Sequence, residues 1–272
     1  MELFLVFIFG TLFGSFLNVV ILRIPKDESV MFPASHCFSC NTPLKPWHNI
    51  PLISWIFLGG KCSFCKAPVS IQYPAIEFLS GMIFFIIAYK MGITLSSTFT
   101  ALAFLVLLAL SMIDFKYKTV PDSLNLLALL LAVLSAYSLD MLIVNLQNAL
   151  LFAGGFTLLR FALSYVLTSA AYKKAKRNDT PWTKHYHRYP FVEAMGEADI
   201  MIAATMGALL GLKLTLFAIF LAAVLALPVM LLVMNRSAEE QRVPFIPFLA
   251  LATFITYLLD SQIYNYLENL YA

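Results

Sequence analysis

Long hydrophobic runs recur from one end of the chain to the other, separated by short polar segments. A helix needs about 20 mostly apolar residues to cross a bilayer, with about 17 to 25 tolerated. Eight segments come near that length, so the pattern predicts about eight transmembrane helices, with six or seven as the alternatives. The predicted spans are residues 3–22, 74–89, 91–113, 123–139, 142–172, 198–212, 214–234 and 243–259.

Composition agrees with this pattern. Hydrophobic residues make up 61% of the chain and charged residues only 12%, whereas soluble domains carry roughly 25% charged residues. We therefore expect an all-α polytopic membrane protein whose surroundings are the lipid bilayer, and we expect no nucleic-acid partner. The chain divides into a first transmembrane helix (1–24), a polar insert (25–73) and a membrane core (74–272).

The basic residues are distributed unevenly among the predicted loops. Lys and Arg stay preferentially in cytoplasmic loops. With the amino terminus outside, all of the 18 basic residues except Lys90, Arg160 and Lys213 fall on the cytoplasmic side. This orientation makes the polar insert cytoplasmic and brings Asp114 and Asp199 to the same, cytoplasmic, rim.

All four cysteines lie in the polar insert, as two Cys-x-x-Cys pairs separated by 21 residues. Two such pairs can supply four thiolates to one tetrahedral Zn²⁺. Two vicinal disulfides or four free thiols are the alternatives, and a cytoplasmic location disfavours disulfides. Four sulfur ligands leave no open position for water, so we expect the zinc to be structural. The predicted ligands are Cys37, Cys40, Cys62 and Cys65.

Two aspartates stand at the rims of apolar segments: Asp114 after the third predicted span and Asp199 at the start of the sixth. A carboxylate at such a depth is costly and often functional. If the two meet, one can stay protonated while the other ionises, as a proteolytic aspartate pair requires. The alternative for each is a residue that merely caps or ends a helix. For Asp122, which follows Pro121, capping is the favoured role.

Other polar residues in apolar segments have a structural interpretation first. Asn18 lies near Gly14 in the first span, where it is expected to mediate a close helix contact. Glu77 lies one turn into the second span, where the helix amino terminus favours a negative charge. Arg160 needs a partner that the sequence does not name, and Glu197 is expected to be a solvated charge.

Several motifs in chain order resemble bacterial prepilin peptidases (type IV leader peptidases), membrane aspartic peptidases of the GxGD type. The resemblance covers about residues 10 to 200 and includes the two Cys-x-x-Cys pairs. Its other motifs are Gly14-Ser15-Phe16-Leu17-Asn18, Arg23-Ile24-Pro25, Pro51-Leu52-Ile53-Ser54-Trp55, Tyr73-Pro74, Glu77, Val120-Pro121-Asp122 after Asp114, and Gly196-Glu197-Ala198-Asp199.

The resemblance implies that Asp114 and Asp199 are catalytic and that Asp122 is ancillary. It also implies that residues 74–272 form a peptidase core in the bacterial inner membrane. Such enzymes cut prepilins or pseudopilins after a glycine at the cytoplasmic face. Many also methylate the new amino terminus with S-adenosylmethionine. No glycine-rich nucleotide signature is visible, so the residues that bind this cofactor stay unassigned.

One position departs from the family pattern, which usually reads Gly-x-Gly-Asp. Ala198 stands where the second glycine is expected. An alanine suffices if only close packing is needed, but it weakens the site if an unusual backbone dihedral is needed. Two other classes stay open: a proton-coupled transporter, although no repeat of helix blocks is seen, and a non-enzymatic assembly scaffold.

Overall fold

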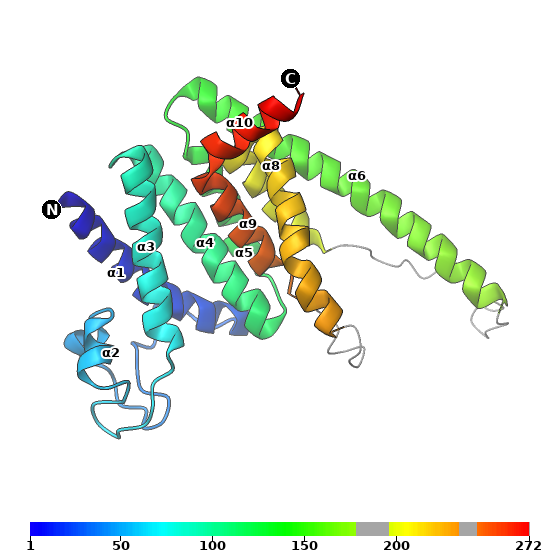
Figure 1. Ribbon diagram of the computed structural model, residues 1–272. Coiled ribbons are helices and arrows are strands. Elements are labelled where there is room, and N and C mark those ends of the chain that lie inside the picture. The colour runs from blue at the N-terminus through cyan, green and yellow to red at the C-terminus, as the bar shows by residue number, and fades with distance from the viewer. Residues whose placement is uncertain (178–195, 234–243, 272) are drawn as a thin grey trace.

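The computed structural model describes residues 1–177, 196–233 and 244–271, and most of the basic stretch 173–188 lies outside them. Long helices form a bundle, a small insert hangs from one end of it, and α6 extends away from the bundle (Figure 1). The α-helices are α1 (Glu2–Arg23), α2 (Ile53–Phe57), α3 (Gln72–Met91), α4 (Leu95–Tyr117), α5 (Asp122–Leu134), α6 (Leu139–Arg177), α8 (Glu197–Val233), α9 (Ile246–Leu258) and α10 (Asp260–Tyr271).

Among the long apolar helices, α4 is the most deeply buried, since 67% of an 18-residue apolar segment of it lies inside the protein. It begins four residues later than predicted, because Gly92 breaks the chain at a φ of 77° and Thr94 forms a capping box with Ser97. It ends at Lys118, which adopts the left-handed conformation. Asp114 therefore lies inside the last turn of α4 and does not end the helix.

Small residues let the helices approach closely. A β-carbon built on Gly14 of α1 would meet the Glu77 Cα of α3 at 2.7 Å, so only glycine fits there. Asn18 donates from Nδ2 to the carbonyl of Tyr73 at 3.2 Å, which confirms its expected role between these helices. Five buried alanines join α4, α5, α6 and α8: Ala103, Ala132, Ala149, Ala204 and Ala208.

The chain turns back on itself inside α8. Gly211 interrupts the helix with φ 72° and ψ −178°, and the Thr215 hydroxyl donates to the carbonyl of Met206 at 3.1 Å. Nine residues of continuous helix would hold these groups roughly 13 Å apart. The segments on either side of Gly211 therefore pack against each other.

Eight spans are not confirmed by helix length and composition. Among the described residues, five helices are long and apolar enough to cross a membrane, or six if α9 and α10 form one span bent by 81°. The predicted count was higher for two reasons. α5 and α9 have only 13 residues each, about 20 Å of helix, and the two arms of α8 count as one helix. α6 exceeds its predicted span, since its 39 residues make a helix of roughly 58 Å.

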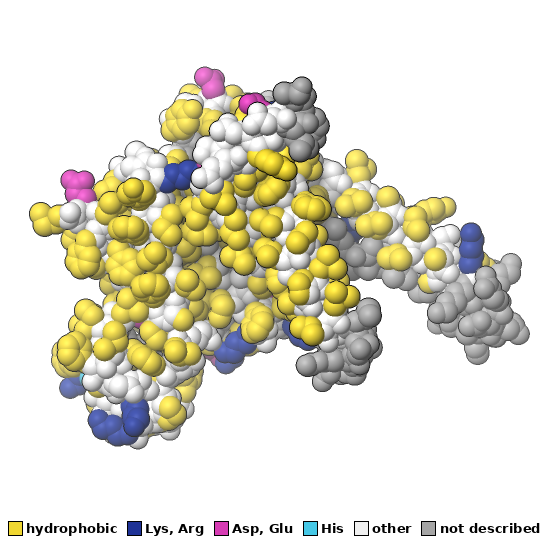
Figure 2. Space-filling model, viewed as in Figure 1, with side chains coloured by type: hydrophobic (Ala, Val, Ile, Leu, Met, Phe, Trp, Pro, Cys, Tyr) yellow, Lys and Arg dark blue, Asp and Glu magenta, His cyan; other side chains and the backbone are white. Residues whose placement is uncertain are grey.

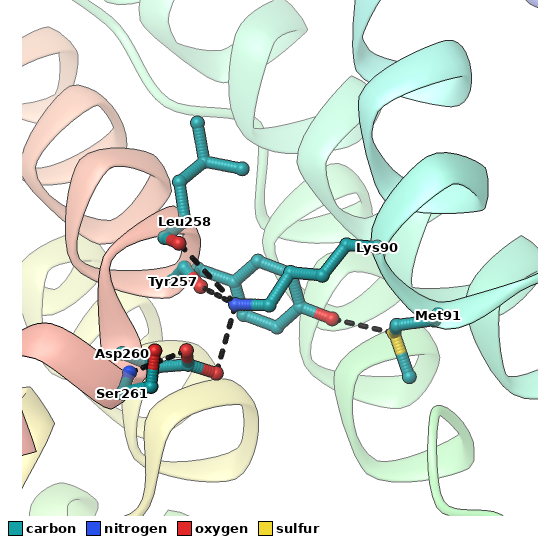
Figure 3. A network of polar contacts seen from close by, with 6 residues as sticks. All are labelled: Lys90, Met91, Tyr257, Leu258, Asp260 and Ser261. Atoms are coloured by element: carbon teal, nitrogen blue, oxygen red, sulfur yellow. Dashed lines mark hydrogen bonds and ion pairs between the residues drawn. The ribbon is translucent and has the colours of Figure 1, made fainter.

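A polar cluster holds α3 to the bend between α9 and α10, at the end of the bundle opposite to the insert (Figures 1 and 3). Lys90 donates to the carbonyls of Tyr257 and Leu258 at the end of α9, and its ammonium lies 2.8 Å from Asp260 Oδ2. The Tyr257 hydroxyl donates to the sulfur of Met91 at 2.6 Å. Lys90 thus binds carbonyls that the helix end leaves without partners.

We expect Lys90→Met to lower the stability of the bundle by about 1 kcal/mol, since the pair is partly exposed to solvent. The measurement is the apparent thermal midpoint of the detergent-solubilised protein. Asp260→Asn should lower the midpoint as well, whereas Asn at the exposed Asp140 of α6 should leave it unchanged. Equal midpoints for all variants would show that the cluster contributes no stability.

Candidate functional site

Asp114 is held at the end of α4 by the first residue of α9. Its carboxyl Oδ2 accepts the backbone N–H of Ile246 at 3.2 Å, across 132 residues of sequence. The aspartate is only 8% exposed. Because α9 begins with this N–H, the helix brings an otherwise unpaired amide to the carboxylate. The contact fixes the orientation of the Asp114 side chain.

Asp199 is half-buried in the first turn of α8. Its carboxylate lies beside Gly196, just before that helix. The neighbouring residue, Ala198, accepts a hydrogen bond at its carbonyl from Asn125 Nδ2 of α5, at 3.4 Å. The first turn of α8 is thus tied to α5, which directly follows α4 and Asp114 in the chain.

The fold places the two aspartates within range of an electrostatic interaction. The charge of Asp114 acts on the carboxyl of Asp199, although 84 residues separate them in the sequence. Two carboxyls that interact in a poorly hydrated place favour sharing one proton over carrying two charges. The arrangement has the chemistry that general acid and base catalysis needs.

Ala198 adopts ordinary helical backbone in the first turn of α8 and is not among the residues with positive φ. A β-carbon built on the preceding Gly196 would lie 3.5 Å from Asp199 Oδ2, an ordinary contact distance. The backbone next to Asp199 therefore needs no glycine for a special dihedral. Of the two possibilities left open by the sequence, the structure favours simple close packing.

Asn125 is a residue of this site that the sequence analysis missed. It is 1% exposed, and its Oδ1 has no hydrogen-bond partner within the part of the chain that the structure describes. A buried amide oxygen without a partner is unusual. The signal in the sequence was an asparagine between leucines at the start of a predicted span.

The predicted capping role of Asp122 is wrong in detail. Pro121 is the N-cap of α5, no side chain caps the helix, and Asp122 is the exposed first helical residue. A carboxylate in the first turn still favours the helix through its dipole. The partner that Arg160 needs is Glu197, with Nη1 to Oε1 at 3.0 Å. Glu197 is exposed, as predicted, but it is paired.

The four cysteines gather at one point of the insert. Their sulfur atoms all lie within 4.8 Å of one another, and none of them forms a disulfide. The same turn is used twice, since the N–H of Cys37 binds the carbonyl of Thr42 and that of Cys62 binds the carbonyl of Ala67. A left-handed residue, Asn41 or Lys66, follows the second cysteine of each pair.

This sulfur arrangement fits a zinc ion. A Zn–S distance of about 2.3 Å gives a tetrahedron with edges of about 3.8 Å, and the Cys37 and Cys65 sulfurs are 3.8 Å apart. The hydroxyl and the backbone N–H of Thr42 lower the pKa of the Cys40 thiol to about 6. Backbone N–H groups of Cys65 and Phe64 likewise lower the pKa of Cys62. Thiolates are the metal-binding form.

Glu77 joins the insert to the bundle. The buried carboxylate on α3 accepts the N–H of Leu52, the residue before α2, at 2.8 Å. This contact supports the structural role expected for Glu77. The insert lies toward the end of the bundle at which α4 ends, and Asp114 is in the last turn of α4 (Figure 1).

Comparison with known proteins agrees with these features. The profile of the bacterial peptidase A24 N-terminal domain matches residues 8–91, and that of the type IV leader peptidase family matches residues 101–231. No solved structure matches the chain.

Curated relatives named prepilin leader peptidase/N-methyltransferase align over most of the chain. The relative from Neisseria gonorrhoeae is 30% identical over 95% of this chain and 91% of its own. The relative from Stutzerimonas stutzeri is 30% identical over 94% and 90%. A relative from Myxococcus xanthus is 38% identical over 51% of this chain and 42% of its own. The chain belongs to the type IV leader peptidase family.

Proposed function

We propose that this protein is a membrane aspartic endopeptidase that removes the basic leader of type IV prepilins or pseudopilins after a glycine. The observation that carries the proposal is the electrostatic interaction between Asp114 in the last turn of α4 and Asp199 in the first turn of α8. The names of relatives that align over nearly the whole chain support the same activity.

The two carboxyls share one proton and exchange roles during the reaction. The ionised carboxylate takes a proton from water as the water oxygen bonds to the scissile carbonyl carbon. The protonated carboxyl stabilises the developing oxyanion and then gives its proton to the leaving nitrogen as the C–N bond breaks. The pair titrates jointly, so the roles belong to the pair and not to either residue.

The cut is expected at the cytoplasmic face of the bacterial inner membrane. This orientation rests on the basic residues, which stay preferentially in cytoplasmic loops. Most of them fall on the side of the predicted topology that also has Asp114 and Asp199. A substrate with a basic leader in the cytoplasm and an apolar helix in the bilayer would have its cleavage site, between the two, at this face of the membrane. We count the two arms of α8 as separate spans in this topology.

We further propose that Cys37, Cys40, Cys62 and Cys65 hold a structural zinc ion. The support is the sulfur geometry. A zinc ion held by these four sulfurs would join the two turns. Four sulfurs leave it no position for water, so its role is to fold the insert.

We also propose that the new amino terminus is methylated with S-adenosylmethionine, on the strength of the relatives' names. The zinc insert is the candidate region by its position alone, and no residue is assigned to the cofactor.

The test is a cleavage assay with the purified full-length protein, a prepilin and detergent, run with and without S-adenosylmethionine. We expect a shortened pilin in both reactions and a methyl group on its amino terminus only with the cofactor. An intact prepilin with well-folded protein would favour an assembly scaffold or a transporter instead.

The alanine in the second family motif gives a separate prediction. We expect Ala198→Gly to leave the cleavage rate within about threefold, because Ala198 already has helical backbone. The same change should lower stability by about 1 kcal/mol, the usual cost of glycine in a helix. Rates and thermal midpoints of both proteins check this. A rate increase of tenfold or more would mean that the alanine does weaken the site.

A further inference from the structure

One face of helix α2 packs against the rest of the insert, and the other face is exposed. On the packed face, Trp55 donates from Nε1 to the carbonyl of Val69 at 3.3 Å, and its ring packs against Gly60. On the other side, Ile53, Ile56 and Phe57 are 52%, 67% and 86% exposed. Positions separated by three and four residues share one face of a helix. These three side chains therefore form a contiguous apolar face with no partner in the described part of the chain.

The height of α2 relative to the bundle follows from its link to Glu77. This glutamate is the sixth residue of α3, so it lies roughly 8 Å along the helix from its first residue. The N–H of Leu52, immediately before α2, is 2.8 Å from its carboxylate. Helix α2 therefore begins beside the first turns of α3 and not beyond the end of that helix.

The bundle surface at this height is apolar. Phe78 and Leu79 follow Glu77 on α3, and both are about half exposed on a helix that has the length and hydropathy of a membrane span. Figure 2 shows hydrophobic side chains over the bundle and on the flank of the insert next to it, with basic side chains at the far end of the insert. The insert is thus apolar on the side next to the bundle and basic on the side away from it, as expected for a segment that lies at a membrane surface.

The charge of the insert suits the same position. No acidic residue occurs between Glu28 and Glu77, so no carboxylate opposes an approach to a membrane surface. Trp47 is exposed and carries the Lys45 ammonium 5.3 Å from its ring centroid. Tryptophan and lysine are side chains that favour the zone between hydrocarbon and water.

We propose that the apolar face of α2, made by Ile53, Ile56 and Phe57, lies in the bilayer at the boundary between headgroups and acyl chains. The occupant of this face is the lipid that surrounds the bundle. An interfacial helix buries its apolar side by about 5 to 10 Å at that boundary, which matches the height set by Glu77. The zinc insert then rests on the membrane beside the bundle. This inference is independent of the proposed cleavage reaction.

The test uses the full-length protein in lipid nanodiscs, without any substrate. A photoreactive benzoylphenylalanine replaces Phe57 in one variant and Lys61 in another, both exposed positions of the insert. After illumination, intact-mass measurement detects a covalently attached lipid. We expect lipid adducts at position 57 to exceed those at position 61 at least fivefold. Equal yields at the two positions, or crosslinks from position 57 only to protein, would overturn the proposal.

A second measurement does not depend on the photoreactive group. Ile56→Asp puts a charge on the proposed lipid face, and Lys61→Glu is the control at a polar position. Hydrogen exchange of the amides in 50–58 should become at least tenfold faster in Ile56→Asp and stay unchanged in the control. Unchanged exchange in Ile56→Asp would show that α2 faces water.

Discussion

Asp114→Asn is expected to abolish prepilin cleavage while leaving an inserted, folded protein. Asparagine has the same shape and still accepts the N–H of Ile246, but it can neither take nor give a proton at the reacting centre. A positioned acid or base contributes about 10² to 10⁴-fold to a rate, so the loss should be on that order or greater. The measurement is the initial rate of leader release.

Asp199→Asn should cause a loss of the same order, because the mechanism needs both carboxyls. Two controls test whether the loss is specific to the pair. Asp122→Asn changes the exposed first residue of α5, and Glu197→Gln breaks the ion pair with Arg160 next to Asp199. Both controls should keep the cleavage rate within about threefold.

The outcome separates the roles of individual residues. A parental rate in Asp114→Asn or Asp199→Asn would remove that residue from the catalytic pair. Loss of activity in Asp122→Asn as well would mean that the exposed aspartate touches the substrate. Retention by all variants would overturn the aspartic mechanism itself.

Cys62→Ser is expected to remove the metal and unfold the insert. Cys62 is buried, with 5% exposure, where its backbone also forms the second turn. Binding of structural zinc contributes about 10 to 16 kcal/mol in small zinc peptides, far more than an insert of this size gains from its own core. Zinc per chain should fall from about one to near zero, as measured by elemental analysis.

Ser39→Ala and Ser63→Ala are the matched controls, since each lies between the two cysteines of a pair. Both should retain zinc. If the insert supports methyl transfer, Cys62→Ser should lose methylation to a greater extent than cleavage. Full zinc content in Cys62→Ser would contradict the four-sulfur site, and loss of cleavage with methylation spared would contradict the role assigned to the insert.

Periodicity and length predicted most helices but not their ends. Hydropathy alone predicts the third span at 91–113, because it does not detect that Gly92 and Thr94 separate α3 from α4. The other end of α4 also lies four residues later than predicted, at Tyr117, and this places Asp114 within the helix. The count of spans failed where helices are short or bent, since length is then a poor measure of crossing.

Some features of the candidate site could likewise be predicted from the sequence, and others could not. Cysteine spacing predicted a cluster of sulfurs because its geometry is local, within two short turns. Asn125 and the link between Arg160 and Glu197 were not predicted, because they depend on how α5, α6 and α8 pack. Long-range contacts of this kind leave little trace in one sequence.

The hydrogen bond that orients Asp114 has an evolutionary consequence. Its donor is the main-chain N–H of Ile246, which every amino acid except proline supplies. Selection can therefore vary the side chain at 246 for packing without removing the donor. Proline is tolerated at the start of a helix, so Ile246→Pro is the one replacement that suits the helix and still deletes the bond.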